Sequence, residues 1–324
     1  MNEKILTNVR IIDPSQNMDE VGSIVINDIG KIKSIGKNVK NSEVSKSADK
    51  IDLKGNIAIP GIVDMKAFVG EPGFEYKENF RTLSQAALAG GVTSIVTMPN
   101  TKPIIDNVSM VDFIIRRGRD KAKVNLFPCA SITRQTAGNQ MTEFGLLKAR
   151  GIIGFSDVNK TIQNTELMSR VMNYASDIDV LIMQHAEDYE LSKSACINEG
   201  EVATRLGLQG VSDIAEKIII ERDLSLLSKF PCRYHINQIS SKNSLNVIKK
   251  NKSNGIRFST GVSINNLSLN QNDIGEFRTF LKLSPPLRSE EDRISLIDGI
   301  RNNLIDVIVS DHIPEDEESK RLPF

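Results

Sequence analysis

Ile59-Pro-Gly-Ile-Val-Asp-Met-Lys-Ala-Phe-Val-Gly-Glu-Pro-Gly73 is the stretch that decides the fold of this chain. Its apolar first part predicts a β-strand over residues 58–65. Polar side chains, Asp64 and then Lys66, come where this strand ends. A strand that ends in polar residues is the pattern that the rest of the chain repeats.

Seven more candidate strands follow, and helical patterns separate most of them. The strands are expected over residues 93–98, 124–129, 151–155, 180–184, 234–237, 255–259 and 306–310. The helices are expected over residues 84–89, 109–117, 165–176, 214–227 and 289–301. Eight strands alternating with helices predict an α/β fold, a (β/α)8 TIM-type barrel over residues 58–324, with its site at the carboxyl ends of the strands.

The first 57 residues have a different residue pattern, without the alternation of strands and helices. β-Branched runs predict short strands over residues 5–12, 23–26 and 31–35, and residues 40–50 are polar and predict a loop. Residues 1–57 are therefore expected to form a small, incomplete β-sandwich unit. At the other end, the residues from Arg321 to Phe324 follow the eighth strand closely, without an eighth helix. We expect the C-terminal part of the barrel to be missing and its seam to be open.

Composition excludes several classes of protein. The 324 residues carry 41 Lys and Arg against 41 Asp and Glu, so no net charge draws the chain to nucleic acid or to an anionic membrane. No apolar run is long enough to span a bilayer, and the N-terminus lacks a signal-peptide core. The three cysteines are few and widely spaced, as expected for reduced thiols in the cytoplasm.

Motifs along nearly the whole chain, in order, resemble those of class I dihydroorotases, in the amidohydrolase superfamily. Several lie in the first half: Pro60-Gly-Ile-Val-Asp64, Glu71-Pro-Gly73, Ala89-Gly-Gly-Val-Thr93 and Met98-Pro-Asn-Thr101. Others follow: Gly154-Phe-Ser-Asp157, Gln184-His-Ala-Glu-Asp188, Ile214-Ala-Glu216, Pro285-Pro-Leu-Arg288 and Ser310-Asp-His312. The family extends about another hundred residues, which would complete the barrel.

The resemblance implies a zinc-dependent reaction, the reversible cyclisation of carbamoyl aspartate to dihydroorotate in pyrimidine synthesis. Such chemistry needs imidazoles and carboxylates to hold the metal, which activates a water. The family's pattern Asp-x-His-x-His-x-Arg-Glu-Pro-Gly stands here with Lys66 and Phe68 in place of the two histidines. A further histidine ligand aligns with Gln238.

Three ligand positions of the family are kept. They are the bridging carboxylate Asp157, the histidine His185 and the catalytic aspartate Asp311. Each also has a purely structural interpretation, His185 as a buried histidine and Asp157 as a cap of its loop. His235, inside the sixth strand, is expected to serve packing.

The substrate-binding positions are also changed. The arginine that would hold the substrate carboxylate aligns with Gly70, and glycine cannot replace a bidentate guanidinium. Asn100 keeps a substrate-binding asparagine, whereas Ser284 and Glu315 replace an asparagine and a histidine. The acid at Glu315 is expected to repel the substrate.

Lys66 could supply the positive charge that a bound metal would otherwise provide. Carboxylates at Asp157 and Asp311 would be costly to bury without a compensating charge. We hypothesise that the Lys66 ammonium takes the electrostatic place of the metal. The alternative is a solvated lysine on a mobile loop.

Three functional interpretations remain open. The first is a non-catalytic, oligomeric homologue, without a cofactor, that acts as a structural partner of the aspartate carbamoyltransferase catalytic chain, as inactive members of the family do. The second is an active cyclic amidohydrolase with one zinc on the three kept ligands. The third is a decaying gene product. In each case we expect no nucleic-acid or membrane partner.

Overall fold

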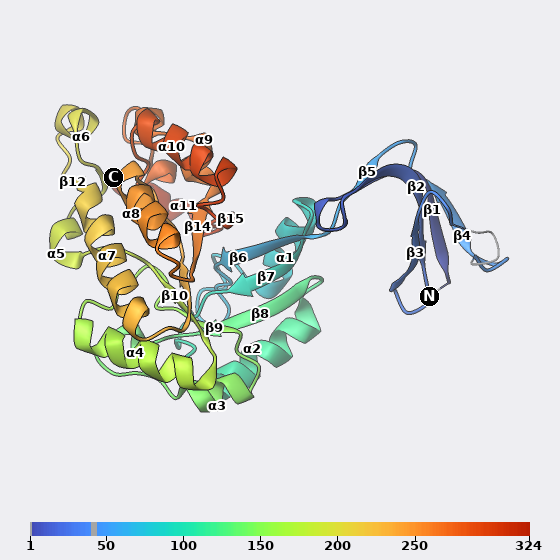
Figure 1. The fold of residues 1–324 in the computed structure, drawn as a ribbon, viewed down its shortest axis with the longest axis horizontal. Coiled ribbons are helices and arrows are strands. Elements are labelled where there is room, and N and C mark those ends of the chain that lie inside the picture. The colour runs from blue at the N-terminus through green and yellow to red at the C-terminus, as the bar shows by residue number, and fades with distance from the viewer. Residues whose placement is uncertain (1, 40–43) are drawn as a thin grey trace. The chain divides into compact units, whose positions relative to one another are not determined.

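The computed structural model describes residues 2–39 and 44–324. The chain consists of two compact units, Met1–Ile62 and Val63–Phe324 (Figure 1). The first unit is a five-stranded sheet in the order β3-β2-β1-β4, with β5 also paired to β1. Its strands are β1 Lys4–Asp13, β2 Met18–Ile26, β3 Ile32–Gly36, β4 Asp49–Asp52 and β5 Ile57–Ala58. Val9, Ile11 and Ile24 form its small core.

The second unit contains an eight-stranded sheet in the order β15-β14-β13-β10-β9-β8-β7-β6. The neighbouring strands run parallel from β7 to β15 along this order. The strands are β6 Ile62–Ala67, β7 Val92–Thr97, β8 Asn125–Ala130, β9 Gly154–Phe155, β10 Leu181–Gln184, β13 Arg233–Ile236, β14 Ser259–Ser263 and β15 Val307–Val309. The prediction of an α/β barrel is confirmed.

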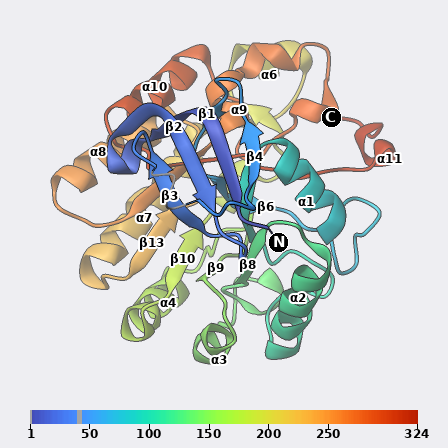
Figure 2. The ribbon, with the colours of Figure 1, turned by 90° about the vertical axis from the view of Figure 1, so that its right-hand side faces the viewer.

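Helices cover the outside of this sheet (Figures 1 and 2). The long ones are α1 Phe80–Ala89, α2 Val108–Lys121, α4 Thr165–Ile178, α7 Asp213–Lys229, α8 Lys242–Ser253 and α10 Glu290–Arg301. The shorter helices are α3 Phe144–Ala149, α5 Tyr189–Ser192, α6 Glu201–Leu206, α9 Ile264–Ser268 and α11 Glu317–Lys320. A two-stranded sheet pairs β11 Ile197–Asn198 with β12 Gly210–Val211. The described residues also contain the 3-10 turns η1 Pro14–Gln16, η3 Arg134–Thr136, η4 Gln271–Ile274 and η5 Thr279–Leu281.

Two apolar cores hold the barrel together. The larger one lies between the strands and the helices, where side chains such as Ile182 and Ile236 pack with Leu224 of α7. The smaller one consists of Val96, Met98, Cys129, Val158 and Met183. These two cores fix the strand ends on which the polar side chains of the site stand.

The first and last strands of the sheet meet at their carboxyl ends. The backbone N–H of Phe68 donates to the carbonyl of His312 at 2.9 Å, and Ala67 and His312 form a parallel bridge. The buried Asp64 carboxylate accepts hydrogen bonds from the N–H and the hydroxyl of Ser310. The barrel is therefore nearly closed, and the described residues link β6 and β15 at this end of the seam, which we had expected to be open.

Most predicted elements lie within a few residues of their observed bounds, and two strands differ. The predicted strand 255–259 is wrong, because β14 begins only at Ser259 and Gly255 has a φ of +81° in the preceding turn. The predicted strand 58–65 is two strands, β5 and β6. The polar loop predicted over 40–50 ends earlier, because β4 begins at Asp49, and its residues 40–43 lie outside the described part of the chain.

Candidate functional site

Lys66 lies at the centre of the barrel mouth. Its ammonium is 3.0 Å from Asp311 Oδ1, and the side chains of both residues are almost fully buried, with 3% and 4% exposed. The ammonium also donates to Asn159 Oδ1 at 3.0 Å and to Gln238 Oε1. The two amide oxygens accept hydrogen bonds, whereas the contact with Asp311 is an ion pair, since Oδ1 of Asp311 accepts no hydrogen bond within the described residues. Lys66 is therefore a buried cation held by two hydrogen bonds and one ion pair, and not a solvated lysine on a loop.

Two of the three substituted histidine positions contact each other. Lys66 stands where one first-strand histidine was expected, and Gln238, just after β13, stands where another was expected. The amide oxygen of Gln238 accepts a hydrogen bond from the ammonium. Lys66 and Gln238 therefore form a direct hydrogen bond at positions where metal ligands were expected.

Asp157 lies apart from this group. Its carboxylate accepts hydrogen bonds from the backbone N–H of Thr133, at 3.0 Å, and from the Thr133 hydroxyl. Burial raises the pKa of Asp157 to about 6, although these hydrogen bonds oppose the shift. Lys66 thus pairs with one of its two expected partners, Asp311, and Asp157 is held by the loop that follows β8.

His185 is buried directly after β10. Its Nε2 lies 3.4 Å from Ser284 Oγ and 3.7 Å from Glu187 Oε2. Burial alone would raise the pKa of Glu187, but the combined effects of His185, Ser192 and Arg288 lower it. In the described chain, Nδ1 of His185 has no hydrogen-bond partner. His185 therefore faces Ser284 and Glu187, and not Asp157.

Gly70 stands at the position where the substrate-binding arginine was expected. This residue has a φ of +70°, and a Cβ atom there would stand 2.3 Å from the Glu78 carbonyl oxygen. An arginine at this position would force the backbone to move. Phe68 is buried, with its ring centroid 6.1 Å from that of Phe74.

Glu315 is not a free negative charge in the structure. Its carboxylate forms an ion pair with Lys77. The expectation that Glu315 repels an anionic substrate therefore did not take the positive charge of Lys77 into account. Asn100 is half-buried after β7, and its Oδ1 accepts no hydrogen bond within the described residues.

A metal does not fit this set of side chains. Over residues 2–39 and 44–324, no group of three or more His, Cys, Asp or Glu side chains is arranged to hold a metal ion. The kept ligand positions Asp157, His185 and Asp311 each have other partners. An ammonium group occupies the partner position of Asp311.

Sequence reasoning missed several residues of this site. Asn159, Thr133 and Lys77 complete the environments of Lys66, Asp157 and Glu315. All three lie in loops, where periodicity gives no signal. The proximity of Asn159 to Asp157, two residues earlier, was the only available indication.

His235 lies inside β13, and its Nδ1 is 2.8 Å from Ser259 Oγ. Burial lowers the pKa of His235 to about 4. The unfolded chain therefore binds a proton at this residue below its ordinary pKa of about 6.5, where the folded chain does not. The stability that neutral His235 contributes is fully present above that value and is lost as the pH falls toward 4.

We expect His235→Gln to flatten this dependence. Between pH 7 and pH 4 the wild type should lose about 3 kcal/mol more unfolding free energy than the variant does. Urea unfolding of both proteins across this range measures the difference. Parallel curves for the two proteins would contradict the assignment, and an NMR titration of the ring protons gives the pKa directly.

No helix in the described residues is long and apolar enough to cross a bilayer. This agrees with the apolar runs of the sequence.

Comparisons with known proteins agree with this fold. The chain of L-hydantoinase (dihydropyrimidinase) from Arthrobacter aurescens superposes with a TM-score of 0.83 at 21% identity, over 99% of this chain and 71% of that one. Dihydropyrimidinase from Brevibacillus agri gives a TM-score of 0.79 at 19% identity, over 98% and 71%. At these identities the likeness establishes the barrel fold alone.

Sequence comparison goes further. The dihydroorotase of Ehrlichia canis is 39% identical over 319 residues, which are 98% of this chain and 71% of that protein. The dihydroorotase of Syntrophus aciditrophicus is 38% identical over 99% of this chain and 74% of its own length. A sequence model of the family described as Dihydro-orotase-like matches residues 55–244. The chain therefore belongs to the dihydroorotase-like family.

Proposed function

We propose that this chain is a non-catalytic dihydroorotase-like protein of pyrimidine biosynthesis. The observation that carries the proposal is the position of Lys66. Its ammonium is buried and paired with Asp311, where a hydrolase of this kind needs an activated water. A paired lysine and aspartate supply neither a metal ligand nor a free base.

The state of the substrate-binding positions supports the proposal. Gly70 leaves no guanidinium to pair with a substrate carboxylate, and its backbone conformation does not admit one. Ser284 lies against His185 in place of the expected asparagine. The residues at the expected substrate-binding positions and at the expected catalytic positions are therefore both changed, as we expect for a protein that neither binds nor converts the substrate.

The framework of the barrel, in contrast, is well formed. Buried Arg288 donates to Ser240, Asn198 and the carbonyl of Val211, and Ser240 in turn donates to buried Glu216. A decaying protein would not be expected to keep such a satisfied buried network. We propose that the retained fold acts as a structural partner of the aspartate carbamoyltransferase catalytic chain.

The first test is zinc stoichiometry. After dialysis into excess zinc and removal of free metal, we expect no bound zinc in the wild type. We expect zinc in the triple variant Lys66→His, Phe68→His, Gln238→His, because it supplies imidazoles at the three substituted ligand positions while Asp157, His185 and Asp311 are kept. Elemental analysis of both proteins measures the difference, and circular dichroism checks that the variant is folded.

One outcome of this test would overturn the proposal. A wild-type chain that holds one zinc, loses it on His185→Ala and hydrolyses dihydroorotate or another cyclic amide is an active amidohydrolase with a mononuclear site. The three kept ligand positions are the feature that would favour that function.

The partner is tested separately. Mixed with the aspartate carbamoyltransferase catalytic chain of the same organism, this chain should migrate as a complex in size-exclusion chromatography with light scattering. The wild type and the triple histidine variant should behave alike, because the metal site is not the proposed interface. Two separate peaks at micromolar concentration would contradict the partnership.

A further inference from the structure

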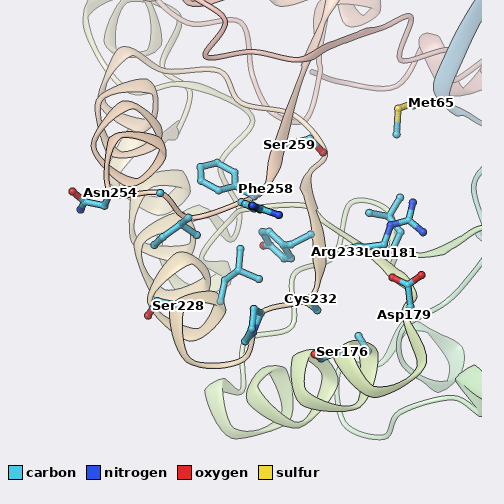
Figure 3. Close-up of a pocket in the computed structure, with 17 residues that line it drawn as sticks. Met65, Ser176, Asp179, Leu181, Ser228, Cys232, Arg233, Asn254, Phe258 and Ser259 are labelled. Atoms are coloured by element: carbon cyan, nitrogen blue, oxygen red, sulfur yellow. The ribbon is translucent and has the colours of Figure 1, made fainter.

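A cavity of about 950 Å³ opens at the amino ends of β10, β13 and β14, the opposite strand ends from Lys66 and Asp311. Figure 3 shows how strand and helix ends combine in its wall, with Arg233 and Ser259 on strands and Ser228 and Asn254 at helix ends. No part of the site described above depends on it.

Two arginines line this cavity beside the amino ends of two neighbouring strands. β13 and β14 are parallel, with His235 opposite Ser259. Arg233 is the first residue of β13, and Arg257 lies in the turn two residues before β14. Both arginines are exposed to solvent at the mouth of the cavity.

Neither guanidinium is neutralised. Within the described chain, no carboxylate lies within ion-pair distance, 4.0 Å, of Arg233 or Arg257. Asp306, close to β14, is instead paired with Lys252 at 2.8 Å. Asp179 is the single carboxylate of the lining, so two positive charges face one negative charge there.

The helix ends at the cavity do not cancel this excess of positive charge. Helices α4, α7 and α8 end beside it, and a helix C-terminus carries a partial negative charge of about one half. At α4 the Lys148 ammonium already donates to the carbonyls of Ile178 and Asp179. Such partial charges act over about one helical turn, whereas each guanidinium carries a full charge with several directed donors.

The rest of the wall is suited to an organic group. Leu181, Ile256 and Phe258 supply apolar surface, and Ser176 and Ser259 supply hydroxyl groups. A pair of guanidinium forks matches the oxygens of a phosphate, and the apolar wall matches a ring or short chain attached to it.

We propose that this cavity binds a small organic phosphate, with the phosphate between Arg233 and Arg257 and its organic part against Leu181 and Phe258. A bound phosphate supplies the negative charge that the lining of the cavity lacks. The proposal is independent of the function proposed above, because it uses none of the same residues.

Isothermal titration of the full chain with phenyl phosphate tests the proposal. We expect saturable one-to-one binding that weakens about 10-fold in Arg233→Gln and in Arg257→Gln, since each variant loses a charge-assisted contact. Arg119→Gln is the matched control, because Arg119 is 73% exposed on α2, outside the cavity. It should bind as the wild type does.

A second measurement does not depend on variants. Phenylglyoxal should modify Arg233 and Arg257, and phenyl phosphate should protect both from it, as mapped by mass spectrometry. Equal modification with and without phenyl phosphate would overturn the proposal, as would binding unchanged in the double arginine variant. Equal affinity for inorganic phosphate would also overturn it, because the apolar wall would then have no role.

Discussion

Replacing Lys66 by methionine should lower the free energy of unfolding by about 3–5 kcal/mol, measured by urea denaturation at neutral pH. The variant keeps the length of the side chain but leaves the buried Asp311 carboxylate without its cation. The amide oxygens of Asn159 and Gln238 also lose their donor. The expected loss is large because the ammonium, the Asp311 carboxylate and the Gln238 amide are shielded from water.

Two comparisons separate this effect from a general loss of charge. Lys77→Met removes a more exposed partner, that of Glu315, and should cost only about 1 kcal/mol or less. The double variant Lys66→Met, Asp311→Leu should recover most of the lost stability, since replacing both members of a buried pair is often neutral. If Lys66→Met cost no more than Lys77→Met, the ammonium would not occupy the place of a metal charge.

Replacing Glu216 by alanine is expected to have a similar effect, about 3–5 kcal/mol. The Glu216 carboxylate of α7 accepts hydrogen bonds from the backbone N–H groups of Ser240 and Ser241 and from the Ser240 hydroxyl. The Ser240 hydroxyl also accepts from Arg288. Removing the carboxylate leaves these buried donors unsatisfied.

Hydrogen exchange localises the effect of Glu216→Ala. The amides of Ser240 and Ser241, after β13, should lose protection before those of the other strands. Glu221→Ala is the control, because its side chain is about half exposed on the same helix and pairs with Lys217 at the surface. Equal unfolding free energies for the two variants would show that the buried network adds no stability.

The sequence allowed most of the barrel to be predicted, because its strands are apolar runs between helices. The strands over 93–98 and 180–184 lie within one residue of β7 and β10. β14 was misplaced for a physical reason. Its residues Ser259, Thr260 and Gly261 carry little apolar signal, whereas Ile256 and Phe258 are apolar residues of the preceding turn that pack against the outer core.

The candidate site could be predicted only in part. The motifs located Lys66, Gln238 and Asp311, and their types indicated a missing metal. They did not indicate that Asn159 completes the ammonium site or that Lys77 neutralises Glu315. Such partners come from loops that the tertiary fold brings together, so spacing along the chain carries no trace of them.

The backbone at Gly70 bears on which of the family's site residues single substitutions could supply. Three single-residue changes would supply imidazoles at positions 66, 68 and 238, but an arginine at 70 would place its Cβ 2.3 Å from the backbone oxygen of Glu78. An arginine at this position would therefore require the backbone near Phe74 and Glu78 to move. Under the proposed function, single substitutions could supply metal ligands to this chain more easily than a guanidinium for the substrate carboxylate.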